Sequence, residues 1–405
     1  MSPRPGDPEP SPSAAGADSV LPTSPCEGMG RGVYVHVPFC LVRCGYCDFN
    51  AYAGMDQLAG PYLEALVREI EASADGGPVG TVFVGGGTPT QLPPAALSGI
   101  IGAVRRSFVL EADAEITVEA NPETVDERVF AALREAGFNR VSVGVQSLAP
   151  HVLRRLDRVH TADRALAALR AARAAGFERL NGDLIFGTPG ESDEDWLQSL
   201  EGVLGAGVDH VSAYALTVEP STPLASAVTR GIVPAPDEDV QADRYEVAER
   251  VLGEAGLVRY EVSNWAKPGR WCRHNLVYWR GGDYFGFGAG AHGHRRGRRS
   301  WNVRLPRTYV ERSPRVEDGF EQLDHVRRRE EAAILGLRLA GGLRRAAFAA
   351  RWGADPLDVW PDELETLRAG GLLDVTPAAV RPAGRGFLLN GHIARTLLSV
   401  PVGPV

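Results

Sequence analysis

Three cysteines, Cys40, Cys44 and Cys47, lie within eight residues of the 405-residue chain. Thiolates at this spacing can bind three irons of a cubane [4Fe–4S] cluster and leave the fourth iron open. An open iron is a position where a substrate or cofactor can bind. The spacing therefore predicts a [4Fe–4S] cluster with one free coordination site.

Two other chemistries also use clustered cysteines. A structural zinc site needs four ligands, and the remaining cysteines, Cys26 and Cys272, form no second pair. A disulfide framework is disfavoured, because five cysteines in 405 residues are sparse and odd in number. Zinc remains the alternative to the cluster.

Polar residues and a glycine turn follow the predicted strands. In parallel βα folds, functional groups gather at the carboxyl ends of strands. Three glycines allow the backbone to approach a ligand, although a plain tight turn is the competing interpretation. A carboxylate inside an apolar strand is costly unless it is paired or faces a site. The candidate ligand-binding residues are Gly86, Gly87, Thr88, Glu119, Gln146, Arg158 and Asp183.

The elements that must position these groups alternate along the chain. Short β-branched runs predict strands, and alanine-rich runs predict helices between them. The strands are expected at 33–37, 81–84, 115–119, 140–146, 180–186 and 210–216, and the helices at 58–72, 125–136, 162–175 and 193–204. This alternation predicts a parallel α/β fold. Such a fold is either a barrel or a doubly wound sheet, and the order of the elements suggests a partial barrel of about six βα units that is open on one side.

The two ends of the chain follow other patterns. Residues 1–30 are rich in Pro, Ser, Ala and Gly, which predicts a disordered tail. Residues 326–405 predict a winged-helix-like α+β module, with helices at 330–339, 344–352 and 357–370 and a hairpin of 372–375 with 386–389. Between the ends we assign 31–235 to the barrel and 236–325 to a region that flanks it.

Composition excludes several classes of partner. The net charge is −8 and no helix carries a concentrated basic face, so we expect no nucleic-acid binding. No run of about 18 apolar residues is present, which predicts no membrane span. The first residues lack the form of a signal peptide. We expect a cytoplasmic protein, because a reducing compartment also suits an oxygen-sensitive cluster.

The cysteine trio with Tyr46 resembles the radical S-adenosylmethionine (SAM) signature. In that superfamily the open iron binds the amino and carboxylate groups of SAM, and reductive cleavage yields a 5′-deoxyadenosyl radical. The runs 34–40, 85–90, 119–122, 144–147 and 183–187 resemble the oxygen-independent coproporphyrinogen III oxidase branch. This resemblance implies a partial (β/α)6 TIM-type barrel of radical SAM type. It implies SAM contacts from Tyr34, Gly86 and Glu119, and from Tyr46, Gly87, Thr88, Gln146, Arg158 and Asp183.

That branch contains true oxidases and the HemW proteins, which are regarded as heme chaperones. The oxidases carry a further cysteine two residues after the third cluster ligand, where this chain has Phe49. The run 274–279 resembles the HNxxYW motif of HemW proteins, and this implies heme binding at His274. Cys272 is the alternative ligand. The arginines at 295–299 are expected to form a solvated loop, with heme propionates as their alternative partner.

Three functions follow in order of preference. The first is a HemW-like heme chaperone that binds heme, a [4Fe–4S] cluster and SAM. It would deliver heme to recipient proteins such as membrane respiratory enzymes. The second is coproporphyrinogen III oxidation. The third is another radical SAM reaction, such as methyl transfer or cyclisation.

Overall fold

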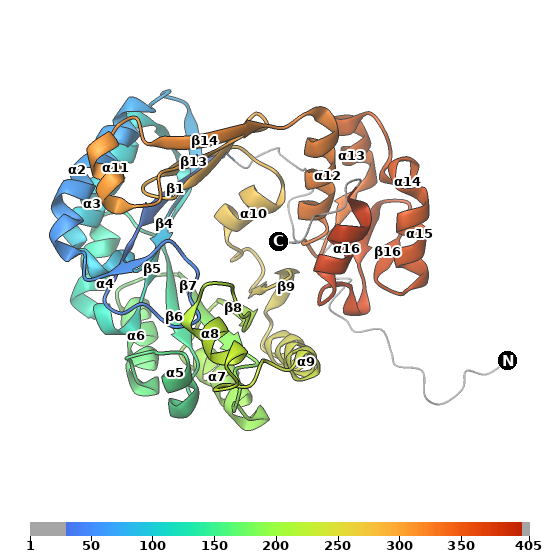
Figure 1. Ribbon diagram of the computed structural model, residues 1–405, viewed down its shortest axis with the longest axis horizontal. Helices are drawn as coiled ribbons and strands as arrows, with labels where there is room; N and C mark the ends of the chain where they lie inside the picture. The colour runs from blue at the N-terminus through green and yellow to red at the C-terminus, as the bar shows by residue number, and fades with distance from the viewer. Residues whose placement is uncertain (1–29, 399–405) are drawn as a thin grey trace.

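The computed structural model describes residues 30–398 (Figure 1). The predicted disordered tail therefore lies, apart from Gly30, outside the described residues. Within the described range, no helix is both long enough and apolar enough to cross a membrane.

Six parallel strands form the curved wall of a partial barrel, which confirms the predicted fold. They are adjacent in chain order and each is hydrogen-bonded to the next. Their side chains are buried on both faces, as is usual in parallel sheets covered by helices. The strands are β1 (Arg31–Val37), β4 (Pro78–Gly86), β5 (Val109–Ala120), β6 (Arg140–Gln146), β7 (Arg179–Phe186) and β8 (His210–Ala215).

Helices cover the outer side of this wall (Figure 1). They are α2 (Ala59–Ala72), α3 (Pro94–Ser107), α4 (Glu127–Glu135), α6 (Ala162–Ala174), α7 (Asp193–Gly205) and α9 (Glu238–Glu254), with the short α5 (Pro150–Arg155) and α8 (Pro223–Thr229) above them. Helix α3 was absent from our prediction. Gly99 and Gly102 lower its helix propensity, but Leu97, Ile100, Ile101 and Val104 recur at helical spacing and are buried.

The sheet continues beyond the barrel at both edges, which the sequence did not predict. Strand β11 (Tyr284–Phe287) lies parallel to β1. Beyond β11 the antiparallel strands are β12 (His292–Arg295), β13 (Arg298–Asn302) and β14 (Glu317–Gln322), and the far edge carries β10 (Asn264–Ala266) and β9 (Val258–Glu261). Helix α10 (Arg273–Trp279) lies near the open side of the barrel, and α11 (Pro306–Arg312) packs on α2.

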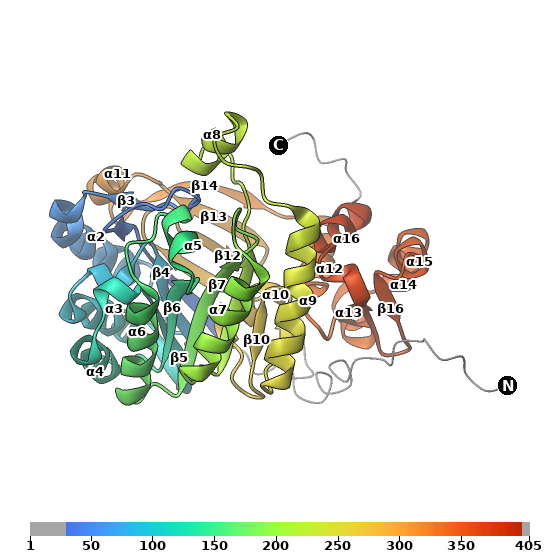
Figure 2. The same ribbon diagram turned by 90° about the horizontal axis from the view of Figure 1, so that it is seen from below.

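A C-terminal module with its own apolar core lies beside the barrel (Figures 1 and 2). It comprises α12 (His325–Gly336), β15 (Leu343–Arg344), α13 (Arg345–Trp352), α14 (Pro356–Val359), α15 (Pro361–Ala369), β16 (Leu373–Val375), β17 (Ala379–Pro382) and α16 (Asn390–Leu397).

The predicted hairpin in this module is half wrong. Strand β16 pairs with residues 379–382, whereas residues 386–389 lead from a short 3₁₀ turn into α16. The closer partner prevails because the Thr376 N–H donates to the Ala379 carbonyl, 2.9 Å away, and so closes a tight turn. Val380, between the flanking strands, is fully buried.

Candidate functional site

A cavity of about 410 Å³ opens at the carboxyl ends of the barrel strands. Its lining includes eleven of the thirteen residues that the sequence assigned to the cluster, SAM or heme. They are Cys40, Cys44, Tyr46, Cys47, Gly86, Gly87, Thr88, Glu119, Gln146, Arg158 and Asp183. The other two, Tyr34 and His274, lie elsewhere.

The loop with the three cysteines is held from two sides. Cys40 ends the short strand β2 (Phe39–Cys40), which pairs with β3 (Tyr52–Ala53). Further along, the Gly45 N–H donates to the Asp157 carboxylate at 3.1 Å. The Gly45 carbonyl accepts from the Leu224 N–H at 2.9 Å. The thiols therefore have a fixed frame, although they belong to a loop.

A polar network connects two cysteine sulfurs to the strand ends. The Thr88 hydroxyl donates to Cys40 Sγ at 3.6 Å, and the Arg158 guanidinium donates to Cys44 Sγ at 3.6 Å. Asn121 links these two side chains: its amide donates to Thr88 Oγ1 at 2.9 Å, and its Oδ1 accepts from Arg158 at 2.7 Å. Hydrogen bonds of this kind orient thiolate ligands and favour their charged form.

The donor set fits a cluster bound by three cysteines. Within residues 30–398, no three His, Cys, Asp or Glu side chains surround a single-ion position. A cubane cluster does not need its ligands around one point, because each thiolate binds a separate iron. Gly87 leaves room beside the loop: a Cβ there would lie 2.6 Å from the Phe39 carbonyl oxygen and 3.0 Å from Cys40 Sγ. Arg158 also lines the cavity, and its buried Nε lacks a protein partner among the described residues.

Two carboxyl groups face the cavity from neighbouring strands. Glu119 accepts from the Gly86 N–H at 2.9 Å, which ties the glycine turn to β5. Burial, followed by the charge of Asp183, raises the pKa of Glu119 to about 7. Asp183 accepts from the Ser142 hydroxyl at 2.8 Å and the Asn181 amide at 2.7 Å. Burial also raises the pKa of Asp183. A cationic group bound in this cavity would favour the ionised form of both carboxyl groups.

Gln146 adopts a left-handed backbone conformation, with φ of 65°, at the end of β6. This conformation is strained for a residue with a side chain and tends to occur at functional positions. The turn is crowded: a Cβ on Gly144 would lie 2.8 Å from Asn121 Oδ1 and 2.9 Å from Gln146 Nε2. The strained turn thus packs Gln146 against the network that reaches the cysteines.

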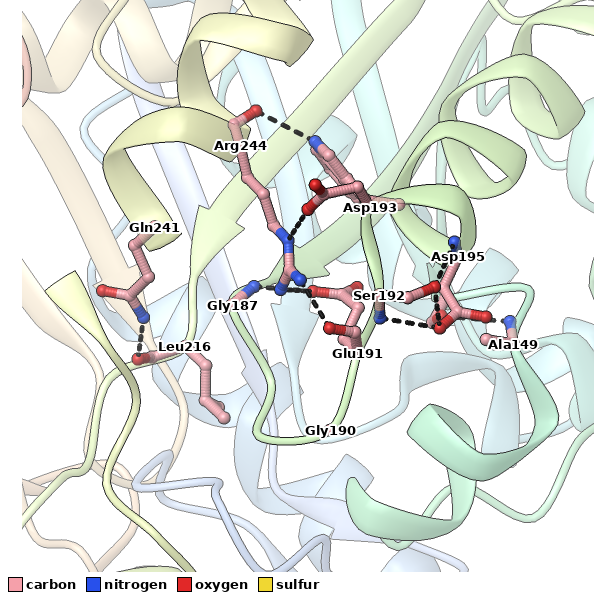
Figure 3. A network of polar contacts seen from close by, with 12 residues as sticks. Ala149, Gly187, Gly190, Glu191, Ser192, Asp193, Asp195, Leu216, Gln241 and Arg244 are labelled. Atoms are coloured by element: carbon pink, nitrogen blue, oxygen red, sulfur yellow. Dashed lines mark hydrogen bonds and ion pairs between the residues drawn. The ribbon is translucent and has the colours of Figure 1, made fainter. Parts of the chain in front are cut away.

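The loops above β7 and β8 are fixed by a buried ion pair (Figure 3). Arg244 of α9 donates to the Glu191 carboxylate at 2.6 Å, and side-chain exposures are 5% and 0%. Glu191 also accepts from the Gly187 N–H at 2.8 Å. Gln241, one turn before Arg244, donates to the carbonyl of Leu216 at 2.9 Å. Because Leu216 lines the cavity, this network supports its wall.

A second cavity of about 300 Å³ adjoins the first and shares Phe49, Gly86 and Glu119 with it. Its other lining residues are Tyr34, His36, Asn50, Tyr278, Tyr284, Gly290 and His292. Tyr34 therefore lies on the far side of Glu119 from the cysteines, and its hydroxyl is 2.9 Å from His36 Nδ1. Phe49 is 62% exposed and lies between the two cavities.

His274 and Cys272 are both in the protein core. His274 is 1% exposed, and Cys272 is fully buried with its thiol 3.6 Å from a Glu115 oxygen. Two of the arginines at 295–299 pair with protein carboxylates: Arg298 with Glu317 and Arg299 with Glu321, each at 2.7 Å.

Sequence reasoning missed Asn121, Ser142 and His36. Asn121 follows the last residue of β5, Ala120, and carried a detectable signal, since it is polar and stands just after a strand. Ser142 lies inside a strand and His36 inside another, and neither has a local pattern that sets it apart. Only their contacts with Asp183 and Tyr34 reveal them.

Comparisons with known proteins agree with this geometry. The Radical SAM superfamily matches residues 34–202, and the HemN C-terminal domain matches residues 323–389. A solved structure of coproporphyrinogen III oxidase (HemN) from Escherichia coli superposes with a TM-score of 0.80 at 25% identity, over 95% of this chain and 93% of that one.

Curated relatives are more similar still. Heme chaperone HemW of Mycobacterium tuberculosis H37Rv is 49% identical over 93% of this chain and 96% of its own length. Heme chaperone HemW of Bacillus subtilis is 35% identical over 90% of this chain and 98% of its own. The three cysteines, the partial barrel and this similarity over nearly the whole length agree, and the chain belongs to the HemW family of radical SAM proteins.

Proposed function

We propose that this protein is a heme chaperone. It binds heme together with a [4Fe–4S] cluster and SAM, and it delivers heme to recipient proteins such as membrane respiratory enzymes. The observation that carries the proposal is the pair of adjoining cavities. One is lined by the three cysteines and the other by tyrosines and histidines, and Phe49 lies between them. The names of the HemW relatives support the heme assignment.

In this proposal the cluster is held by Cys40, Cys44 and Cys47. SAM would be held in the larger cavity, where Glu119 and the glycine turn would bind its amino group. When bound, the cluster and SAM supply one-electron chemistry. The residues of the chain have simpler tasks: Arg158 and Thr88 orient the thiolates, and Gly86 presents its backbone to the ligand. We place the protein in the cytoplasm, where thiols stay reduced.

Phe49 argues against oxidase activity. The oxidases of this branch carry a cysteine at this position, and a phenyl ring can neither bind metal nor donate hydrogen as a thiol can. The ring lines both cavities, so the thiol is absent from the place where SAM and a porphyrin would meet. The protein would therefore bind SAM without converting coproporphyrinogen.

Anaerobic reconstitution with iron and sulfide, followed by hemin titration, tests the chaperone. We expect a Soret band distinct from that of free hemin, with a stoichiometry of one. The Cys40→Ala variant should lose the visible absorbance of the cluster but should keep the Soret band of bound heme. A titration indistinguishable from free hemin would refute the proposal.

Coproporphyrinogen III oxidation is the second candidate, because the HemN structure shares the whole fold. An anaerobic assay with SAM, a reductant and coproporphyrinogen separates the two functions. We expect SAM turnover without protoporphyrinogen in the wild type. Decarboxylated product from the wild-type protein would favour the oxidase instead.

A further inference from the structure

The histidine of the HNxxYW run is not placed to bind iron. Its Nδ1 lies 2.8 Å from the Thr81 hydroxyl, and its Nε2 lies 2.8 Å from the Tyr278 hydroxyl. Axial ligation needs one imidazole nitrogen with a free lone pair. His274 is also 1% exposed and packs on Phe83 with ring centroids 5.3 Å apart. Its contacts instead attach α10 to β4 and hold Tyr278 in position.

His292 differs from His274 in each of these respects. It is exposed at the start of β12 and lines the second cavity. Its ring has no hydrogen-bond partner in the part of the chain that the structure describes. By contrast, the other histidine of that cavity, His36, is engaged at both nitrogens, by Tyr34 at 2.9 Å and by the Asn50 carbonyl at 2.9 Å. His292 thus presents the available imidazole of this cavity.

The surroundings of His292 suit a flat aromatic ligand. Tyr278 and Tyr284 meet edge to face, with ring centroids 4.7 Å apart, and Phe49 completes the apolar lining. The ring of Trp301, on the paired strand β13, lies 6.1 Å from the His292 ring. Aromatic side chains offer large faces to a porphyrin. The HNxxYW run contributes to this cavity through Tyr278, which His274 holds from behind.

Positive charge lies at the rim of the same cavity. Burial, with the charges of Arg299 and Arg304, lowers the pKa of His292 and keeps the imidazole in its neutral form. Arg299 is already paired with Glu321 at 2.7 Å. Arg304 is exposed and has no ion-pair partner within residues 30–398. Its carbonyl accepts from Asn50 at 2.9 Å, which fixes its place at the rim.

We propose that His292 is the axial ligand of the heme iron, and that Arg304 pairs with a heme propionate. This rests on the proposed heme-binding function. The cavity, at 300 Å³, is at the low end of ligand pockets, which measure about 300–1,000 Å³. A porphyrin bound there leaves much of its surface exposed, as suits a cargo that must be handed on. The shared Gly86 and Glu119 place that cargo beside the cluster cavity.

Hemin titration of the full chain after anaerobic cluster reconstitution tests this ligand. For His292→Ala we expect the affinity for hemin to fall by about tenfold or more. The Soret and electron paramagnetic resonance signals of histidine-ligated heme should be lost. Added imidazole should restore both signals. Arg304→Gln should weaken binding without moving the Soret band, because it removes a charge and no ligand.

The matched control is His294→Ala, two residues along the same strand. The His294 ring is hydrogen-bonded to the Gly282 carbonyl at 3.0 Å, so its nitrogen is already engaged. Replacing His294 should leave the heme spectra unchanged. His274→Gln should lower thermal stability yet retain the histidine-ligated spectrum. Cluster absorbance and circular dichroism confirm that each variant is folded.

Two results would overturn the inference. If His292→Ala binds hemin with wild-type affinity and spectrum, another residue is the ligand, while heme binding by the protein stands. If the wild type itself gives only the spectrum of free hemin, the proposed function fails and the ligand assignment fails with it.

Discussion

The affinity for SAM should depend on pH through Glu119. In the proposed complex this carboxylate receives the amino group of SAM, so it must be ionised. Its pKa in the free protein is raised to about 7 by burial and by Asp183. Below pH 7 the side chain is mostly neutral, and SAM binding must then displace a proton. Affinity should therefore increase as the pH rises through 7.

The size of the effect follows from the titration of Glu119. The ionised fraction of a carboxyl with a pKa of about 7 rises from about 0.1 at pH 6 to about 0.75 at pH 7.5. The amino group of SAM also titrates over this range, but it affects the wild type and a Glu119→Gln variant by the same factor. The ratio of wild-type to Glu119→Gln affinity for SAM should therefore be about sevenfold higher at pH 7.5 than at pH 6.

Anaerobic equilibrium dialysis of the reconstituted protein with labelled SAM measures this ratio. Glu119→Gln retains an oxygen for the Gly86 N–H but cannot ionise. Its affinity should be weaker, and any pH dependence that it keeps comes from the amino group of SAM alone. The reasoning is refuted if the ratio of the two affinities is the same at pH 6 and at pH 7.5.

Three further results are expected. Gly87→Ala places a Cβ 2.6 Å from a backbone carbonyl oxygen of the cluster loop; it should bind less iron and sulfide than the wild type, while Gly102→Ala on α3 should match the wild type. Arg244→Met leaves the buried Glu191 unpaired, so chemical denaturation should show a loss of about 3–5 kcal/mol; a loss under 1 kcal/mol would mean that water reaches the pair. Glu69 has a pKa raised from 4.5 to about 7 by burial, so the folded state keeps its proton over that range. The free energy of unfolding should decrease by about 3 kcal/mol as the pH rises from 4.5 to 7, and a Glu69→Gln protein with an equal slope would contradict this origin.

Much of the barrel follows from local patterns. All six predicted strands are present, and the strand at 140–146 has the bounds that the sequence predicted. The buried parallel strands are continuous β-branched runs, and such runs are visible without tertiary information. The short strands at the sheet edges escaped prediction because segments such as 292–295 and 298–302 are polar and pair with neighbours that are close only in the fold.

The cysteine spacing, the strand-end residues and Phe49 were accessible from the sequence, since each depends on residue type at a short interval. The contacts that each side chain makes in the fold could not be predicted from the sequence. His274 lies beside aromatic residues in sequence, yet Thr81, 193 positions earlier, takes one of its nitrogens. Asn121 joins Thr88 to Arg158 because the ends of β4 and β5 and the loop after α5 meet around one cavity. Closure of the parallel sheet brings these distant residues together, so the tertiary structure alone decides which polar groups are occupied and which, such as His292, face an open cavity.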